Sequence, residues 1–230
     1  MKIIIYSQHL VSMDGVGNSA IYFENLFKSF CEVLLVANYS NIDGVLNFKE
    51  YCKKHSTNNI LFYHYSIEDP NIKLLLELKF KKRIIYFHGI TPPKFFNPES
   101  EIFNSCKKGL KDIKLISDFD LYISNSTESK NQFLDNLNNN FLESQKFINM
   151  PPIDLFSKKN KVKKNKSIKP GLKFYYCGTL VKHKNINSLL DLFNKNLMNK
   201  VHLSIFTSFS KEECLYFLGE YKYNEYLENG

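Results

Sequence analysis

Short apolar runs alternate with longer amphipathic segments along most of this chain. The runs are rich in Ile, Val, Phe and Tyr and predict buried strands at residues 2–6, 33–37, 60–65, 83–88, 121–124 and 147–150. The amphipathic segments predict helices at about 19–30, 70–80, 99–117 and 126–137. This βα alternation indicates an α/β fold with a parallel, doubly wound sheet, in which ligands bind at the carboxyl ends of the strands.

The pattern stops at a lysine-rich stretch and then restarts on a smaller scale. Strands are predicted at residues 173–177 and 201–206, and helices at 185–197 and 211–227. Two strands and two helices are few for a doubly wound domain. We therefore expect a complete Rossmann-like domain, a linker and a partial Rossmann-like unit, over residues 1–156, 157–171 and 172–230.

The net charge comes from one segment of the 230-residue chain. Lys and Arg number 31 against 23 Asp and Glu, a formal net charge of +8. Eight of the lysines lie within residues 158–173, where there is no acid, and the remaining 31 − 8 = 23 bases balance the 23 acids. Aromatic residues are not interleaved with these lysines, so base stacking has no support and no nucleic-acid partner is expected.

Cysteine use and hydropathy bear on the compartment. The five cysteines are widely spaced and contain no C-x-x-C pair, which favours reduced thiols in a cytoplasmic protein. No apolar stretch approaches the ~18 residues needed to cross a bilayer, and the amino-terminal apolar run is too short for a signal peptide. Peripheral contact with the inner face of a membrane stays open.

The segment Gly15-Val16-Gly17-Asn18-Ser19-Ala20 fits the pattern G-x-G-x-x-A. We expect it to be a loop whose glycines let the backbone approach a phosphate before the next helix begins. NAD is disfavoured, because the motif comes eight residues after the predicted strand and no acid ends the second strand. A phosphate- or sugar-binding loop and an ordinary glycine turn both remain open.

Three further motifs follow strands on the expected ligand side. His88-Gly89 ends one strand, where histidine can donate to a sugar hydroxyl, transfer a proton or be structural; His64, one strand earlier, is predicted to be structural. Asn125-Ser126 follows another strand and predicts a helix cap. Gly178-Thr179 precedes Lys184 and a helix, a plausible phosphate site or a solvated loop.

The order of these pieces resembles glycosyltransferase family 4, of the GT-B fold. The resemblance rests on the glycine segment, then "YFHGITPP", "YISNS", "NMPPID" and "CGTLVKHKN", and covers about residues 1–206. It implies two Rossmann-like domains, an acceptor side and a nucleotide-sugar side. It also implies sugar transfer with retention of anomeric configuration, with no metal and no cofactor apart from a UDP- or GDP-linked sugar as co-substrate.

The resemblance also assigns roles to residues. Gly15 and Gly17 match the loop that approaches the donor phosphate and the acceptor, and His88 matches the histidine that faces the donor sugar. Asn125 and Ser126 match a turn on the cleft rim. Gly178 and Thr179 stand where the family usually has Gly-Arg, and Lys184 matches the lysine that neutralises the donor diphosphate. His88 and Lys184 are therefore the predicted catalytic residues.

One family motif has no counterpart. Glu212 and Glu220, and Glu220 and Glu228, have the spacing of the family's Glu-x7-Glu motif, but they fit a charged helix face. We therefore expect the chain to end before most of the donor site. Three interpretations stay open beside another nucleotide-binding Rossmann enzyme. They are a hexosyltransferase acting on a bacterial glycan or lipid-linked acceptor, a non-catalytic remnant or subunit that needs a separate donor-domain chain, and a binder of nucleic acid or anionic membranes that uses the lysine run.

Overall fold

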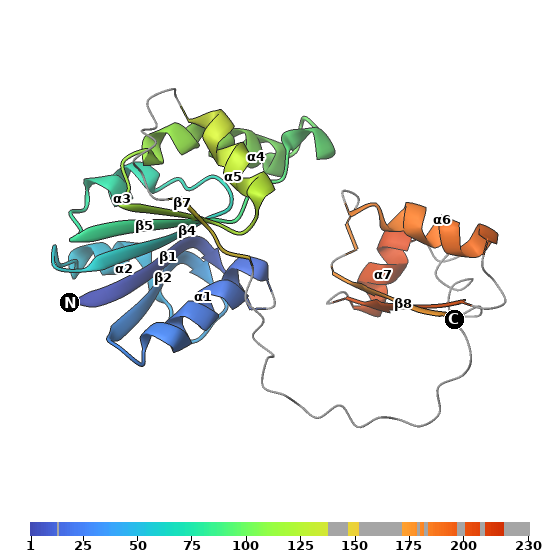
Figure 1. Ribbon diagram of the computed structural model, residues 1–230, viewed down its shortest axis with the longest axis horizontal. Coiled ribbons are helices and arrows are strands. Elements are labelled where there is room, and N and C mark those ends of the chain that lie inside the picture. Colours follow the sequence, from blue (N-terminus) through green and yellow to red (C-terminus); the bar gives the residue numbers. More distant parts are fainter. Residues whose placement is uncertain are drawn as a thin grey trace. The chain divides into compact units, whose positions relative to one another are not determined.

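The computed structural model separates into two units, Met1–Lys159 and Asn160–Gly230, each with its own sheet (Figure 1). It describes residues 1–12, 14–137, 147–151, 172–178, 180–181, 184–196, 201–207 and 210–218. The predicted linker, residues 157–171, lies outside these ranges.

The first unit is built on a seven-stranded sheet in which every neighbouring pair is parallel. The strand order is β3-β2-β1-β4-β5-β6-β7. The chain thus builds outward from β1 to one side and from β4 to the other, which is the doubly wound arrangement that the sequence predicts. The strands are β1 Lys2–Leu10, β2 Glu32–Ser40, β3 Leu46–Asn47, β4 Ile60–Tyr65, β5 Lys82–Phe87, β6 Leu121–Ser124 and β7 Phe147–Asn149.

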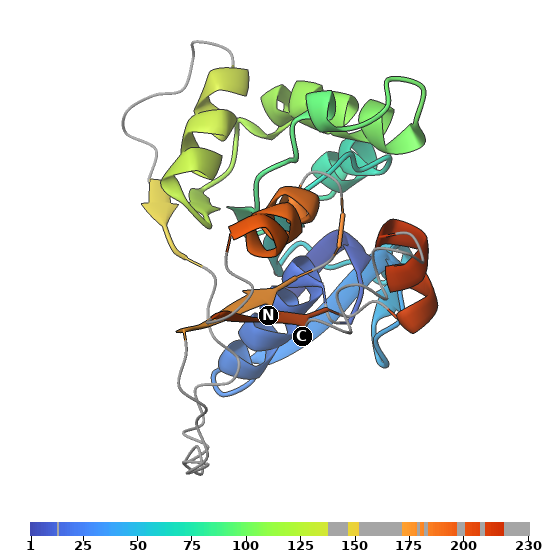
Figure 2. The same ribbon diagram turned by 90° about the vertical axis from the view of Figure 1, so that its right-hand side faces the viewer.

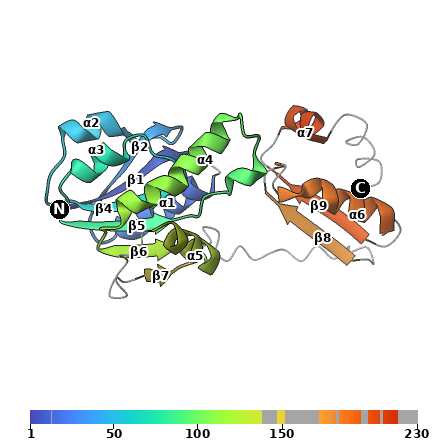
Figure 3. The same ribbon diagram turned by 90° about the horizontal axis from the view of Figure 1, so that it is seen from above.

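Helices cover both faces of this sheet (Figures 1 and 3). Helix α1 packs on one face, and the later α-helices of the same unit supply apolar side chains on the opposite face. Coverage on both faces explains why the strands are continuous apolar runs. The helices are α1 Gly15–Phe27, α2 Phe48–Lys53, α3 Ile72–Glu77, α4 Glu101–Asp112 and α5 Thr127–Asn136, with 3-10 helices η1 Pro93–Phe95 and η2 Ile113–Ile116.

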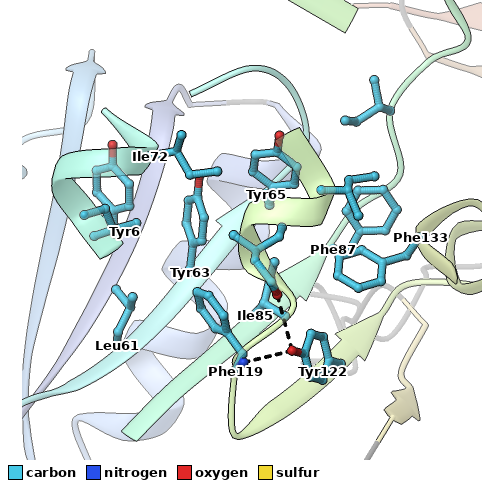
Figure 4. Packing of buried hydrophobic residues seen from close by; sticks show 14 of the residues in the cluster. Tyr6, Leu61, Tyr63, Tyr65, Ile72, Ile85, Phe87, Phe119, Tyr122 and Phe133 are labelled. Atoms are coloured by element: carbon cyan, nitrogen blue, oxygen red, sulfur yellow. Dashed lines mark hydrogen bonds between the residues drawn. The ribbon is translucent and has the colours of Figure 1, made fainter. Parts of the chain in front are cut away.

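Tyrosines occupy much of the core opposite α1 (Figure 4). A buried tyrosine needs a partner for its hydroxyl group. The Tyr65 hydroxyl donates to the Gly109 carbonyl at 2.7 Å, and the Tyr122 hydroxyl accepts from Phe119 N–H at 2.8 Å and donates to the Ile116 carbonyl at 3.3 Å. These bonds fix α4 and the segment after η2 against β4 and β6.

The second unit has a pair of parallel strands, β8 Leu172–Cys177 and β9 Val201–Phe206, with helices α6 Ile186–Asn196 and α7 Lys211–Leu218. Helix α6 covers one face of the pair (Figures 1 and 2). Its small core contains Leu180, Ile186 and Leu190. Both the strand-helix order and the parallel pairing agree with the predicted partial Rossmann-like unit.

Some element boundaries differ from the prediction. Strands β1 and β2 run to Leu10 and Ser40, beyond their apolar runs, because their polar ends pair with each other. The predicted helix start at Pro70 is wrong, since α3 begins at Ile72, and β3 with α2 was missed because the pair is so short. The predicted end of the last helix lies outside the described residues.

The expected glycine loop is wrong in a way that matters for the site. Helix α1 already begins at Gly15, with Asp14 as its N-cap; the Asp14 carboxylate accepts a hydrogen bond from Val16 N–H at 3.1 Å. Aspartate is among the preferred N-cap residues, so the helix begins earlier than the predicted start at about residue 19. Gly15 and Gly17 therefore lie in the first turn of α1.

Candidate functional site

The point at which the strand order reverses lies between β1 and β4, and β5 is the next strand beyond β4. In open α/β sheets a crevice forms outside the carboxyl ends of the strands at such a point. His88 directly follows β5. Its place agrees with the ligand side that the sequence predicts.

The turn after β5 is held by backbone and side-chain hydrogen bonds. His88 N–H donates to the Tyr65 carbonyl at 2.9 Å. Ile90 N–H donates to Gln132 Oε1 at 2.8 Å, and Gln132 Nε2 donates to the Ile90 carbonyl at 2.7 Å. Between them Gly89 has φ +80°, and an added Cβ would lie 2.7 Å from Ser129 Oγ. Glycine is thus required by both the backbone angle and the space.

Asn125 and Ser126 support this turn from the next strand. Asn125 Nδ2 donates to the His88 carbonyl at 2.8 Å, while its Oδ1 accepts from Ser129 Oγ at 2.6 Å. Ser126 is the N-cap of α5, as predicted, and accepts from Ser129 N–H at 3.0 Å. The Asn-Ser pair therefore links the start of α5 to the backbone of His88.

The His88 ring pairs with His64, a contact that the sequence analysis did not anticipate. Nδ1 of His64 lies 2.9 Å from Nε2 of His88, with the ring centroids 5.0 Å apart and the ring planes 28° apart, so the two rings meet edge to edge. His64 is 1% exposed, and burial lowers its pKa well below the ordinary value, with the charge of His88 adding to the effect. Burial lowers the pKa of His88 to about 4. Both imidazoles are therefore neutral at pH 7.

The two glycines of α1 have different surroundings. A Cβ on Gly17 would lie 1.9 Å from the Val11 carbonyl oxygen, so this glycine permits close packing of α1 on the chain after β1. A Cβ on Gly15 would meet nothing within 4 Å. Gly15 is the open position, but the Asp14 carboxylate beside it already takes the Val16 N–H and opposes an incoming phosphate.

The predicted residues of the second unit lie between β8 and α6. Gly178 has φ +154°, and its N–H donates to the Phe206 carbonyl at 2.9 Å. Lys184 is exposed two residues before α6, and Thr179 is outside the described residues. Asn185 has φ +53° and its Oδ1 accepts from Ser188 Oγ at 2.7 Å. The strand, turn, lysine and helix follow the predicted order.

A buried carboxyl group near the same end of the first sheet was also missed. Asp69 is 1% exposed; its Oδ2 accepts from the Tyr63 hydroxyl at 2.8 Å and its Oδ1 from Asn71 N–H at 2.9 Å. Burial raises its pKa above the ordinary value. These bonds fix the segment between β4 and α3.

The residues missed at the site carry different sequence signals. His64 pairs in register with Tyr86, which is two residues before His88. Correct strand alignment therefore places His64 and His88 as diagonal neighbours on the same face of the sheet. Gln132 reaches Ile90 across 42 residues of sequence, and no local pattern indicates that contact.

The described residues lack two kinds of feature. They contain no group of three or more His, Cys, Asp or Glu side chains able to hold a metal ion. Over the same ranges, no helix has the length and apolar character needed to cross a membrane.

Comparisons with known proteins support the fold. No protein-family model and no curated protein sequence matches the chain. An α-glucosyltransferase in complex with UDP matches with a TM-score of 0.56 and 17% identity, over 94% of this chain and 61% of that one. An α-glucosyltransferase in complex with UDP and a 13-mer DNA containing a central A:G mismatch matches with a TM-score of 0.52 and 18% identity, over 89% and 56%. The chain thus spans about three fifths of their length, and it has the mostly parallel, Rossmann-like α/β fold of GT-B glycosyltransferases.

Proposed function

We propose that this chain takes part in glycosyl transfer from a nucleotide-sugar, of the family 4 type, with retention and without a metal. The proposal rests mainly on the position of His88. Its backbone is fastened by Asn125 and its ring by His64, at the carboxyl end of β5 in a chain that shares the fold of UDP-bound glucosyltransferases. We infer UDP-sugars as the first donors to test and GDP-sugars as the second.

The proposed chemistry needs a donor group near the sugar and positive charge near the diphosphate. His88 would hydrogen-bond the donor sugar, and Lys184 would neutralise the diphosphate as the glycosidic bond to it breaks. Lys184 is exposed, so its ammonium group is free to meet a solvated phosphate. The acceptor hydroxyl would attack the anomeric carbon from the face that the diphosphate leaves, and its proton would pass to the departing diphosphate oxygen. A glycan or lipid-linked acceptor is the proposed partner.

Calorimetric titration of the full chain with UDP-glucose, UDP-N-acetylglucosamine and GDP-mannose tests this proposal. Binding of one donor, weakened about tenfold or more by Lys184→Ala, is expected, because a charge-assisted phosphate contact contributes roughly 1.5–3 kcal/mol. Lys73→Ala, at an exposed lysine of α3, is the matched control and should leave the affinity unchanged. Absence of heat with every donor would contradict the proposal.

Turnover separates the catalytic proposal from its alternative. A chain that binds a donor but transfers no sugar to any acceptor, alone or with a separate donor-domain chain, would fit the non-catalytic remnant. Transfer that appears only when such a second chain is added would support the subunit interpretation.

DNA is a second candidate acceptor, contrary to the expectation from the sequence. One structural neighbour is bound to DNA as well as UDP, and eight lysines lie within residues 158–173 of this chain. Lysine contacts to phosphates make binding strongly salt-dependent. Transfer of labelled sugar to duplex DNA that is lost when these lysines are replaced by glutamine would favour DNA over a glycan as the acceptor. Transfer to a glycan without any transfer to DNA would exclude DNA as the acceptor.

A further inference from the structure

His64 and His88 must divide one proton between the two nitrogens that face each other. Nδ1 of His64 and Nε2 of His88 are 2.9 Å apart, within hydrogen-bond range. A neutral imidazole has one donor nitrogen and one acceptor nitrogen. The direction of the hydrogen bond between two neutral rings therefore decides which of the two outer nitrogens, Nε2 of His64 or Nδ1 of His88, carries a proton.

The surroundings of His64 decide whether His64 or His88 is the donor. Its ring lies against Phe23 of α1, Phe62 of β4 and Tyr86 of β5, with centroid distances of 5.9, 5.1 and 5.4 Å. Ser7 of β1 is its register partner on the remaining side. Nε2 of His64 is buried and has no hydrogen-bond partner within the described part of the chain.

A buried N–H without a partner is rarer in proteins than an unpaired acceptor. If His88 donated to His64, the outer nitrogen of His64 would be such an N–H among aromatic rings. If His64 donates instead, its outer nitrogen is only an unpaired acceptor. The second arrangement avoids the orphaned donor, so His64 is the donor of the pair.

The outer nitrogen of His88 then carries a proton. His88 is partly exposed, and its Nδ1 makes no hydrogen bond to any residue in the described ranges. The burial that keeps both rings neutral also prevents the pair from taking up a second proton near pH 7. His88 is thus able to donate from Nδ1 and unable to accept there.

We propose that His64 is a positioning residue that holds His88 in its Nδ1–H tautomer, so that His88 offers a hydrogen-bond donor to a ligand oxygen. The identity of that oxygen as one of a donor sugar rests on the proposed function above. The tautomer itself does not. The pair thereby favours the donor role for His88 over the proton-accepting role that the sequence left open.

Long-range ¹H–¹⁵N NMR of the full chain at pH 7 reads each imidazole directly, with His88→Gln assigning the signal among the six histidines. The expected wild-type spectrum has His88 protonated at Nδ1 and bare at Nε2. A proton on Nε2 of His88, or a doubly protonated His88, would overturn the proposal whether or not the His64 variants fold.

Two substitutions test the part played by His64. His64→Leu removes the donor and should leave His88 as a mixture of tautomers. His64→Asn keeps an amide nitrogen at the position of Nδ1 and should restore the Nδ1–H form. A folded His64→Leu protein whose His88 keeps a single Nδ1–H tautomer would show that His64 does not set it.

UDP-glucose affinity supplies a separate outcome. His64→Leu should weaken binding roughly three- to tenfold through misdirection of one hydrogen bond, and His64→Asn should recover most of it. If the wild-type protein binds no nucleotide-sugar, the proposed function fails while the tautomer measurement still stands. If it binds UDP-glucose equally well in all three forms, His88 does not donate to this ligand and the proposal is overturned.

Discussion

The turn after β5 and the turn after β8 each place a glycine just behind a strand, but the structure fixes them by different means. Gly89 is held by Gln132 and Asn125, which come from other elements and bond the residues on either side of it. Gly178 has a backbone bond to the neighbouring strand, and Lys184 beyond it is exposed. Tertiary contacts position the histidine, whereas the described contacts near the lysine are local.

The two sheets also differ in how well their faces are covered, and again the first unit is the more tightly packed. The seven-stranded sheet is covered on both faces, as parallel sheets usually are. In the β8–β9 pair Tyr175 is 65% exposed and Phe206 56% exposed, with ring centroids 6.1 Å apart. The first unit therefore offers a rigid support for a ligand-binding side chain, and the second unit offers much less burial for the same purpose.

The largest expected loss of stability is at a third glycine position, in the first turn of α1. Gly17→Ala should destabilise the first unit by about 3 kcal/mol or more, because its Cβ would lie 1.9 Å from a backbone oxygen that cannot move alone. Gly15→Ala is the matched control and should be neutral or stabilising by about 0.5 kcal/mol, since its Cβ meets nothing. Urea unfolding followed by circular dichroism measures both. Equal effects would contradict the packing role of Gly17.

The next effect compares the two glycine turns directly. Gly89→Ala should cost about 2–3 kcal/mol, from the positive φ and from the contact with Ser129 Oγ. Gly178→Ala should cost less, about 1–2 kcal/mol, from its φ of +154° alone, since its Cβ would make only an ordinary 3.4 Å contact with the Tyr176 hydroxyl oxygen.

Gly44→Ala separates backbone strain from steric contact at Gly89. Gly44 has φ +79° and nothing within 4 Å of an added Cβ, so the difference in unfolding free energy between the two variants isolates the Ser129 contact. If Gly44→Ala and Gly89→Ala cost the same, the close packing against α5 contributes nothing.

A smaller effect is expected at the support of the His88 backbone. Asn125→Ala should cost about 1–2 kcal/mol, because the His88 carbonyl loses its side-chain donor and the Ser129 hydroxyl loses its acceptor, keeping only the bond from the Ser126 hydroxyl. Asn149→Ala removes an exposed bond to the Thr127 hydroxyl and a long bond of 3.4 Å from the Ser124 hydroxyl, and should cost less, about 0.5 kcal/mol. Chemical denaturation compares the two. A loss at Asn125 no larger than at Asn149 would remove the proposed support.

The smallest effect is a pH dependence at Asp69. Its folded-state pKa is raised, so its stabilising contribution is complete below the unfolded-state pKa and falls as pH rises through the folded-state pKa. The stability of the wild type relative to Asp69→Asn should therefore increase as pH is lowered from 7 toward 4. Thermal unfolding over this range measures it, with Asp43→Asn, at an exposed residue, as the control. An unchanged difference would contradict the raised pKa.

Much of the fold was predictable because it follows from local patterns. The strands 60–65, 121–124 and 201–206 have their predicted bounds, since each apolar run is closed by turn residues. The first turn of α1 was not predicted, because the glycine motif suggested a loop while the cap at Asp14 had already started the helix. The extension of β1 to Leu10 depends on pairing with β2, which no single-strand pattern contains.

The position of the site residues was predictable from the sequence, but the hydrogen bonds and burial that hold them were not. His88, Asn125 and Ser126 could be placed on one rim because His88 ends a predicted strand and the other two follow the next one. The bonds that give them their roles join residues far apart in sequence, such as His64 with His88 and Asn125 with the His88 carbonyl. Burial, which makes both imidazoles neutral, is likewise a property of the packed core and not of the motif.

The most direct test of the central claim is an NMR titration that compares UDP-glucose with UDP on the full chain. The account predicts that UDP-glucose shifts the imidazole signals of His88 and the Gly89 amide, and that UDP alone leaves them largely in place, because only the sugar meets the turn after β5. Saturable binding of UDP-glucose with the His88 and Gly89 signals unmoved would contradict it.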